Sequence, residues 1–363
     1  METCEILIVE DNEEMRNSWI RDIRDFNRSN PRPFNLSETF ATTKNEAIAR
    51  LRRFRFDCAI VDLRLPHGDA TEGADRPLGN DVIEVILDLS GIPTYVYSGF
   101  DAEASDLARH SNIRVIPKQG GASRKILASI ASEAPLMEAM ERTRSILFRE
   151  TSKLFNQSIW SRWEKRWSGQ LDRDVISGII ARQTISHIAE SLAKAPAKHH
   201  PEEFYIVPSL HSNRLDTGDI LELGKKLYVV LTPRCNMANS PPEYYLLASL
   251  LVVPDWIKWK ADLLGDSGKK RERAEKEIRS HANQGHEIGS HFLPPLNGDG
   301  PWLVDFKEAR TIRSRLANKL VDKRVATVAP QFVPNLVQRY SSYLGRIGQP
   351  DIGDAELIDL CKL

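Results

Sequence analysis

The chain has 363 residues, 41% of them hydrophobic and 28% charged, and its 50 basic residues balance its 50 acidic ones. A chain of this length and composition can bury a core in each of two or three globular domains, which excludes a mini-protein. Its longest apolar run, residues 244–254, is shorter than the roughly 20 residues that span a bilayer, and acidic residues interrupt the N-terminus where a secretory signal would be apolar. We therefore expect a cytoplasmic protein that makes no contact with a membrane.

Short apolar segments alternate with amphipathic ones in the first part of the chain. Strands are predicted at residues 5–10, 34–41, 58–63, 94–98 and 114–117, and helices at 12–28, 44–54, 80–89, 102–109 and 123–132. Asn12 is placed to cap the first helix. This alternation predicts an α/β domain with a five-stranded, doubly wound parallel sheet that helices cover on both faces.

The second part of the chain changes character twice. Residues 136–195 are continuously compatible with helix, and the tryptophans at 160, 163 and 167 are expected in a core or an interface. Strands are then predicted at 205–208, 220–223, 226–231, 244–253 and 303–305, and helices at 267–281 and 333–344. We expect three parts: a first domain at residues 1–134, a helical linker or signalling region at 135–200, and an α+β output domain at 201–363.

Charged and polar side chains follow four of the predicted strands of the first domain. Glu10 and Asp11 end the first strand, Asp62 the third, Ser98 the fourth and Lys118 the fifth. The carboxyl ends of parallel strands meet at one edge of a sheet, where functional groups of this architecture gather. Clustered carboxylates repel one another unless a cation neutralises them, and hard oxygen ligands suit Mg²⁺. We predict a magnesium site formed by Glu10, Asp11 and Asp62.

The same cluster has the groups that phosphoryl transfer requires. A carboxylate can attack phosphorus and form an acyl phosphate when a metal ion and cationic side chains absorb charge on the transferring group. We predict Asp62 as the nucleophile. Lys118 would bind one phosphoryl oxygen as a point charge and Ser98 would donate a hydrogen bond to another, although serines at strand ends also act as caps.

Residues 5–132 resemble a response-regulator receiver domain of two-component signalling. The resemblance rests on the acids in IVEDN, Asp62 in AIVDLRLP, a glycine opening the third helix, Ser98 in YVYSG and Lys118 in VIPKQ. It implies a flavodoxin-like fold, Mg²⁺-dependent phosphotransfer from a sensor histidine kinase to Asp62, and rearrangement of the loop containing Ser98 upon phosphorylation.

The sequence departs from the receiver pattern at three places. The stretch between Pro66 and Gly79 is longer than the usual loop, and it is expected to be a partner-contacting lid or a tolerated insertion. Gln119 stands where the family commonly has proline, and Val115 stands where it often has a switch aromatic. These departures leave phosphate acceptance intact and put the usual serine-to-aromatic relay in doubt.

Parts of residues 205–352 resemble an uncharacterised bacterial family with a small barrel-like β domain. The matching segments are ELGKKLYVVLTPRC at 222–235, FLPP at 292–295 and RIGQP at 346–350. Some members accompany kinases and receivers in phage-defence loci, so the resemblance implies a role in antiviral defence. It implies no catalytic residue.

Two groups of side chains in the second part of the chain are of reactive or metal-binding types, but their sequence context favours a structural role. Cys235 is a candidate nucleophile near His286 or His291, but a lone cysteine at the end of an apolar strand is more often buried. His281, His286, Glu287 and His291 invite a metal site, yet their spacing and the intervening glycines differ from helical zinc motifs.

The charge pattern does not favour nucleic-acid binding. Residues 1–134 have 17 basic and 22 acidic residues and the remainder has 33 and 28, an excess too small for a basic stripe. Residues 175–192 include a glycine and are followed by no recognition helix. The four cysteines lack metal-ligand spacing and are expected to be reduced thiols.

Together these features predict a response regulator that is phosphorylated on Asp62 by a sensor histidine kinase and controls an output other than DNA binding, in stress or phage defence. We expect no enzymatic activity beyond phosphorylation and autodephosphorylation at Asp62. One alternative is a phosphate sink or adaptor that competes with a second receiver-effector protein for the kinase. Another is a nuclease-like effector that phosphorylation switches on. A homodimer is compatible with each.

Overall fold

The computed structural model describes residues 2–65, 78–99, 110–168, 172–193, 198–209, 213–238, 242–265, 268–346 and 353–362. These residues form two compact units, Met1–Ala195 and Pro196–Leu363, which are considered separately. No helix among the described residues is long and apolar enough to cross a membrane.

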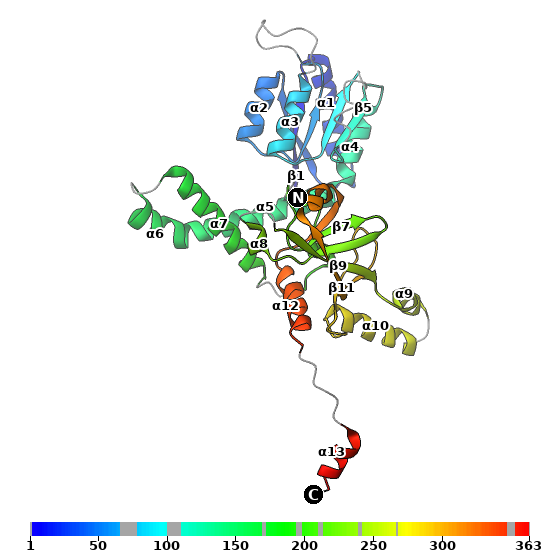
Figure 1. Cartoon of the computed structure of the whole chain (residues 1–363). Helices are drawn as coiled ribbons and strands as arrows, with labels where there is room; N and C mark the ends of the chain where they lie inside the picture. Colours follow the sequence, from blue (N-terminus) through cyan, green and yellow to red (C-terminus); the bar gives the residue numbers. More distant parts are fainter. Residues whose placement is uncertain are drawn as a thin grey trace. The chain divides into compact units, whose positions relative to one another are not determined.

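The first unit is built on a five-stranded parallel sheet with the order β2-β1-β3-β4-β5 (Figure 1). The strands are β1 (Thr3–Val9), β2 (Asn35–Ala41), β3 (Cys58–Val61), β4 (Thr94–Ser98) and β5 (Ile113–Pro117), and the helices are α1 (Glu13–Arg28), α2 (Lys44–Arg53), α3 (Gly79–Leu89) and α4 (Ala122–Ser132). This order is that of flavodoxin-like folds. The predicted doubly wound sheet is therefore confirmed.

Side chains of β1 point alternately to the two faces of the sheet and pack into two separate hydrophobic cores. Ile6 and Ile8 pack with residues of α1 and α4 on one face of the sheet. Leu7 and Val9 pack with residues of α2 and α3 on the other. Because both faces are covered, the strands are apolar throughout, as expected for a buried parallel sheet.

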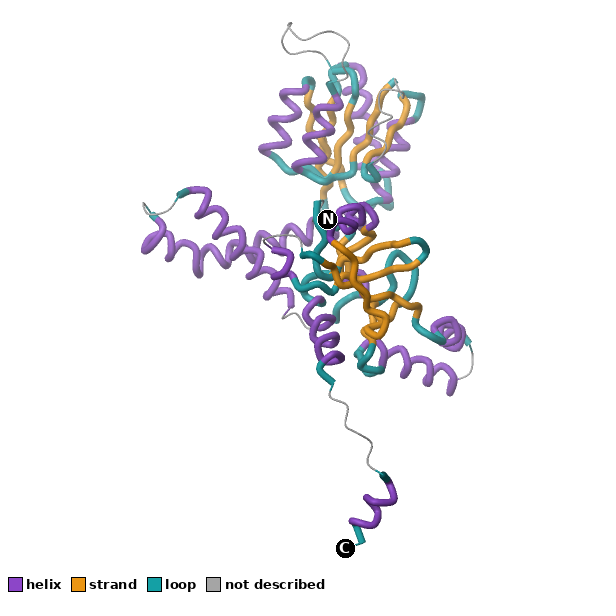
Figure 2. Tube along the Cα trace, in the orientation of Figure 1, coloured by secondary structure: helices purple, strands orange, loops and turns teal. Residues whose placement is uncertain are grey.

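A helical hairpin follows the sheet in the chain. Its first arm comprises α5 (Ala134–Leu154), a π-helical segment (Phe155–Ile159), α6 (Trp160–Arg162) and a second π-helical segment (Trp163–Trp167), and its second arm is α7 (Arg173–Ala193) (Figure 2). Ser191 of α7 donates a hydrogen bond to Glu150 of α5 at 3.1 Å. Trp167 is buried between the arms, whereas Trp160 and Trp163 are exposed and so belong to no core, and their place in an interface stays a prediction.

The second unit contains a seven-stranded sheet with the order β10-β11-β9-β8-β7-β12-β6, in which every pair is antiparallel. Its strands are β6 (Tyr205–Ile206), β7 (Asp219–Leu223), β8 (Lys226–Val230), β9 (Tyr244–Val252), β10 (Ser290–Leu293), β11 (Trp302–Arg313) and β12 (Arg324–Val328). Its longer helices are α9 (Trp256–Leu264), α10 (Gly268–Ala282) and α12 (Val333–Leu344), and its short ones are α8 (Arg234–Ala238), α11 (Ser314–Ala317) and α13 (Asp354–Leu360).

The two ends of this sheet approach each other. Tyr205 of β6 donates a hydrogen bond to the carbonyl oxygen of Pro294, directly after β10, at 2.6 Å. Leu293 and Leu296 share one hydrophobic core with Val328 of β12 and Leu336 of α12. The sheet therefore curls around its core, which agrees with the predicted α+β domain with a barrel-like sheet.

The differences from the predicted elements are specific. β10 and β12 were not predicted, and β11 is longer than the strand expected at 303–305. The helix predicted at 102–109, Pro66 and most of the long loop before Gly79 lie outside the described residues. The domain limits expected at residues 134 and 200 remain predictions.

Candidate functional site

The predicted site residues lie at one edge of the first sheet. Glu10 and Asp11 follow β1, Asp62 follows β3, Ser98 ends β4 and Lys118 follows β5. Parallel pairing in register places these four strand ends next to one another. The side chains of Glu10, Asp11, Asp62 and Lys118 lie together there, and Ser98 lies at the neighbouring strand end.

The start of α1 fixes the acidic pair. The side chain of Asn12 accepts a hydrogen bond from the backbone N–H of Met15 and so caps α1 as predicted, while the N–H of Asn12 donates to Glu10 Oε1 at 3.2 Å. Arg16, one turn into the helix, donates to the carbonyl oxygens of Glu10 and Asp11 at 3.1 and 2.5 Å. Arg16 was not predicted as a site residue, because the one sequence feature that marks it is its position on the first helical turn after Glu10 and Asp11.

Asp62 is held by the backbone around it. Its N–H donates to the carbonyl oxygen of Val9 at 2.9 Å, and its Oδ1 accepts from the N–H of Arg64 at 3.3 Å. Gly79 opens α3 against this segment, and a Cβ atom there would overlap the carbonyl oxygen of Asp62 and the Cα of Leu63. Only glycine allows this close approach.

Lys118 links two of the three carboxylates. Its Nζ lies 2.8 Å from Asp62 Oδ2 and 2.9 Å from Glu10 Oε2, and 5.4 Å from the centre of the Tyr97 ring. Burial disfavours charge on this amine, but its hydrogen bonds to Asp62 and Glu10 outweigh burial and raise the pKa of Lys118. The lysine is therefore cationic at neutral pH.

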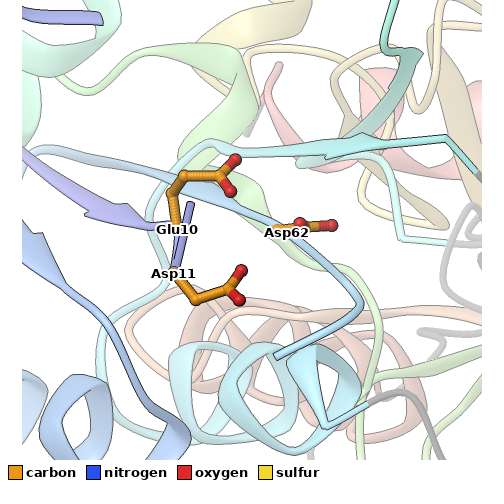
Figure 3. Close-up of side chains that lie close together, drawn as sticks. All are labelled: Glu10, Asp11 and Asp62. Carbon is orange, nitrogen blue, oxygen red and sulfur yellow. The ribbon is translucent and has the colours of Figure 1, made fainter. Parts of the chain in front are cut away.

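Glu10 is the deepest of the three acids, and only 2% of its surface is exposed. Burial raises the pKa of Glu10, and the hydrogen bond from Lys118 opposes that rise. Asp62 is also buried, whereas Asp11 is exposed at the mouth of the site. The carboxylates of all three point into a shared space (Figure 3).

The three acids have the chemistry and the spacing of a metal site. Each offers one carboxylate oxygen, and these oxygens lie within 4.8 Å of one another. Among the described residues, this is the one group of at least three His, Cys, Asp or Glu side chains that is close enough to hold a metal ion. An all-oxygen donor set at a partly open edge fits a hard divalent cation such as Mg²⁺.

Ser98 is fully buried at the end of β4. Its carbonyl oxygen accepts a hydrogen bond from the N–H of Lys118 at 3.1 Å, which ties the ends of β4 and β5 together. Val115 is partly buried and packs on the core that α2 and α3 cover. The roles assigned to Ser98, Lys118 and Asp62 in phosphotransfer remain predictions.

The candidate residues of the second unit do not form a comparable site. Cys235 is exposed, so its preferred interpretation as a buried packing residue is wrong, and its thiol lies 3.5 Å from Asn236 Oδ1. The rings of His281 and His286 stack at 5.1 Å, while His291 is buried in β10. Within the described part of the chain, these histidines belong to no group of three donors with metal-ligand spacing.

Sequence comparison finds no matching family model and no matching curated protein. Structural comparison finds 117 matching chains, and several of them are described as receiver domains. The receiver domain of a putative LuxO repressor protein from Vibrio parahaemolyticus is 18% identical, with a TM-score of 0.31, and the match covers 39% of this chain and 97% of that one.

Two further solved structures match over the same share of the chain. A CheY-like receiver domain from Methanospirillum hungatei is 19% identical, with a TM-score of 0.31, and the match covers 38% of this chain and 99% of the other. The receiver domain of a sensor histidine kinase from Pseudomonas aeruginosa, described with a magnesium ion in its active-site cleft, is 20% identical, with a TM-score of 0.28 and coverages of 36% and 96%. The fold of the first unit is given by its own strand order, which is that of flavodoxin-like folds. The family resemblance of the second unit stays a prediction.

Proposed function

We propose that residues 1–134 accept a phosphoryl group on Asp62 from a sensor histidine kinase in a Mg²⁺-dependent reaction. The main support is the placement of Lys118, whose Nζ lies within 2.9 Å of carboxylate oxygens of both Glu10 and Asp62. A buried nucleophile, two further acids and a cation at one sheet edge are the parts that carboxylate phosphorylation requires.

The proposal assigns a task to each side chain. An Asp62 Oδ atom attacks phosphorus, and the O–P bond to Asp62 forms as the bond between phosphorus and the donor breaks, so that the donor leaves with the electron pair of the broken bond. Lys118 leaves its carboxylate partners to bind a phosphoryl oxygen, and Ser98 donates a hydrogen bond to a second oxygen. Mg²⁺, held by Glu10, Asp11 and Asp62, would neutralise charge on the transferring group.

We propose that phosphorylation of the first domain acts through residues 135–200 on an output domain at 201–363 that does not bind DNA. Its partners would be the kinase and a second copy of this chain, and its setting would be stress or phage defence. The packing of Val115 where a switch aromatic is usual favours a second candidate, a phosphate sink that shares the kinase with a second receiver-effector protein. The described residues offer no donor cluster in the second unit to support the nuclease-like alternative.

Intact mass after incubation with Mg²⁺ and acetyl phosphate tests the proposal. Wild type should gain one phosphoryl group, Asp62→Ala none, and a surface variant, Asp359→Ala, as much as wild type, because Asp359 is an exposed residue of the second unit that pairs with Lys362. Loss of the adduct when EDTA replaces Mg²⁺ is expected as well. If wild type gains no mass while a control receiver does, the proposal fails.

A further inference from the structure

A cleft lies at the edge of the first sheet opposite to Asp62. It is lined by residues 51–56, 89–90, Met140 and Arg144, which all belong to the first unit. The first of these segments directly precedes β3 and Asp62 follows β3, so the cleft and the acidic cluster lie at opposite ends of that strand. The volume of the cleft is about 670 Å³, and sites for small molecules have roughly 300–1,000 Å³. We call it the arginine cleft.

The arginine cleft has a large apolar component. Leu51 and Phe56 are each 6% exposed and belong to the core that α2 and α3 cover, where these two helices lie side by side (Figure 1). Phe54, Leu89 and Met140 are 51%, 53% and 40% exposed. Large apolar side chains of three segments are thus gathered around one hollow, where the apolar part of a ligand would cover them.

The charged side chains of the cleft have one sign. Those that the structure describes are all arginines, Arg52, Arg53, Arg55 and Arg144. Arg144 Nη1 lies 3.4 Å from Oδ1 of Asp57, which is outside the lining. No described carboxylate pairs with Arg52, Arg53 or Arg55, and all three are exposed. The hollow therefore concentrates positive charge in a chain whose net charge is zero, which favours an anionic ligand.

The end of α2 explains only part of this charge. Basic side chains in the last turn of a helix offset the partial negative charge of its free carbonyl groups, an effect that falls off within that turn. Arg52 and Arg53 are in the last turn of α2. Arg55 lies beyond the C-cap residue, Phe54, and Arg144 comes from α5. Helix stability therefore gives no reason for the meeting of these arginines at one hollow, whereas an anion bound there does.

The residue types indicate which anion. A planar guanidinium binds phosphate through two parallel hydrogen bonds, whereas lysine binds it as a point charge, and the described lining has four arginines and no lysine. The guanidinium carbon of Arg53 lies 5.5 Å from the centre of the exposed Phe54 ring, so a planar group already covers this ring. A nucleobase stacks on such a ring in the same way. Phosphate groups joined to a flat ring are the composition of a nucleotide.

We propose that the arginine cleft binds a nucleotide with several phosphate groups, its phosphates on the arginines and its base on Phe54. The site is separate from the phosphorylation proposed for Asp62 and does not depend on it. Because Met140 and Arg144 belong to α5, the bound nucleotide contacts both the sheet with its helices and the first arm of the hairpin.

Calorimetric titration of the full chain with ATP tests the role of the arginines. EDTA is present throughout, so that no metal ion links ATP to the acidic cluster. Wild type should bind one ATP, and Arg53→Gln combined with Arg55→Gln should weaken binding by roughly tenfold or more, because two charged donors to phosphate are lost. The matched control is Arg24→Gln combined with Arg124→Gln. These two exposed arginines belong to α1 and α4, which cover the other face of the sheet, and ATP binding should stay as in wild type.

Phe54→Leu tests the base separately from the phosphates. It keeps an apolar side chain and removes the flat ring, so ATP should bind roughly tenfold more weakly. Inorganic tripolyphosphate, which has no base, should bind wild type more weakly than ATP does, and this variant as it binds wild type. Thermal melting followed by circular dichroism checks that every variant is folded.

Four results would overturn the proposal. Wild type that does not bind ATP would do so, as would equal ATP binding by wild type and the Arg53→Gln, Arg55→Gln variant. Tripolyphosphate that binds wild type as tightly as ATP would show a site for phosphate alone. Displacement of ATP by an equal concentration of hexaglutamate would show a site for acidic peptides. None of these results bears on the phosphorylation of Asp62, which intact mass measures separately.

Discussion

The Nζ atom of Lys118 lies 2.8 Å from Asp62 Oδ2, so the cation at the end of β5 is paired with the carboxylate at the end of β3. The same atom lies 2.9 Å from Glu10 Oε2. A metal ion and Lys118 would therefore compete for the same two carboxylates. This competition gives the site a property that can be measured apart from phosphorylation.

Replacing Lys118 should change metal binding and phosphorylation in opposite directions. In Lys118→Met the acids lose a positive neighbour, so Mg²⁺ should bind about tenfold more tightly, because a like charge near the ion has been removed. Phosphorylation by acetyl phosphate should slow by about 100-fold, since a charged donor to the transferring group is lost. Calorimetric titration with MgCl₂ and intact mass over time measure the two effects.

The matched control for this lysine is Lys362→Met. Lys362 pairs with Asp359 at 3.0 Å on the surface of the second unit, so neither Mg²⁺ affinity nor phosphorylation should change. Weaker Mg²⁺ binding by Lys118→Met would contradict the competition.

Gly79→Ala should destabilise the first unit. The added Cβ would overlap the backbone of Asp62 and Leu63, and such overpacking costs about 2 kcal/mol. Because backbone atoms must move, the variant should also accept phosphate more slowly. Urea-induced unfolding and intact mass check the two effects.

Gly120→Ala is the control for this substitution. No atom lies within 4 Å of the Cβ position at Gly120, and its φ is not positive. Its free energy of unfolding should therefore stay close to that of wild type. Equal stability of the two alanine variants would show that α3 does not depend on the close approach at Gly79.

The sequence predicted the site more completely than the second sheet. Each strand that ends at the site is a short apolar run followed by a charged or polar residue, so both the strand and its functional end were visible. β12 is the short segment RVATV and begins with Arg324, whose partner Asp219 is 105 residues away in the chain. Local pattern cannot reveal a strand whose polar first residue is stabilised by a distant carboxylate.

The ion pair between Asp219 and Arg324 should be important for the second unit. Both side chains are buried, with Arg324 NH1 3.0 Å from Asp219 Oδ2, and Thr327 Oγ1 donates to the other carboxylate oxygen. Asp219→Ala leaves a buried cation without this partner, which typically costs about 3–5 kcal/mol. Urea-induced unfolding of the full chain should show the loss in the transition of the second unit.

A double variant distinguishes two effects on stability at the Asp219–Arg324 pair, the unpaired buried charge and the lost packing. Asp219→Ala combined with Arg324→Met removes both charges and should recover part of the lost stability. Asp359→Ala is the control, because Asp359 pairs with Lys362 on the surface and such pairs contribute less than about 1 kcal/mol. A double variant less stable than Asp219→Ala would contradict this account.

His291 should make the second unit sensitive to acid. It is 2% exposed in β10, and its Nδ1 is buried without a hydrogen-bond partner. Burial, together with the charges of Arg339 and His286, lowers the pKa of His291 to about 3. The unfolded chain, in which histidine has its ordinary pKa of about 6.5, therefore binds a proton more readily than the folded one.

The sign of the effect follows from this difference. The stability that neutral His291 provides is fully present above pH 6.5 and is lost as the pH falls toward 3, by about 2 kcal/mol at pH 5. His286, whose pKa burial lowers to about 4, adds to the loss in the same range. Calorimetric melting of the full chain at pH 7.5 and pH 5 should show a smaller shift for His291→Leu than for wild type. His110→Leu, at an exposed position of the first unit, should keep the full shift, and an equal shift in all three proteins would mean that His291 does not titrate with unfolding.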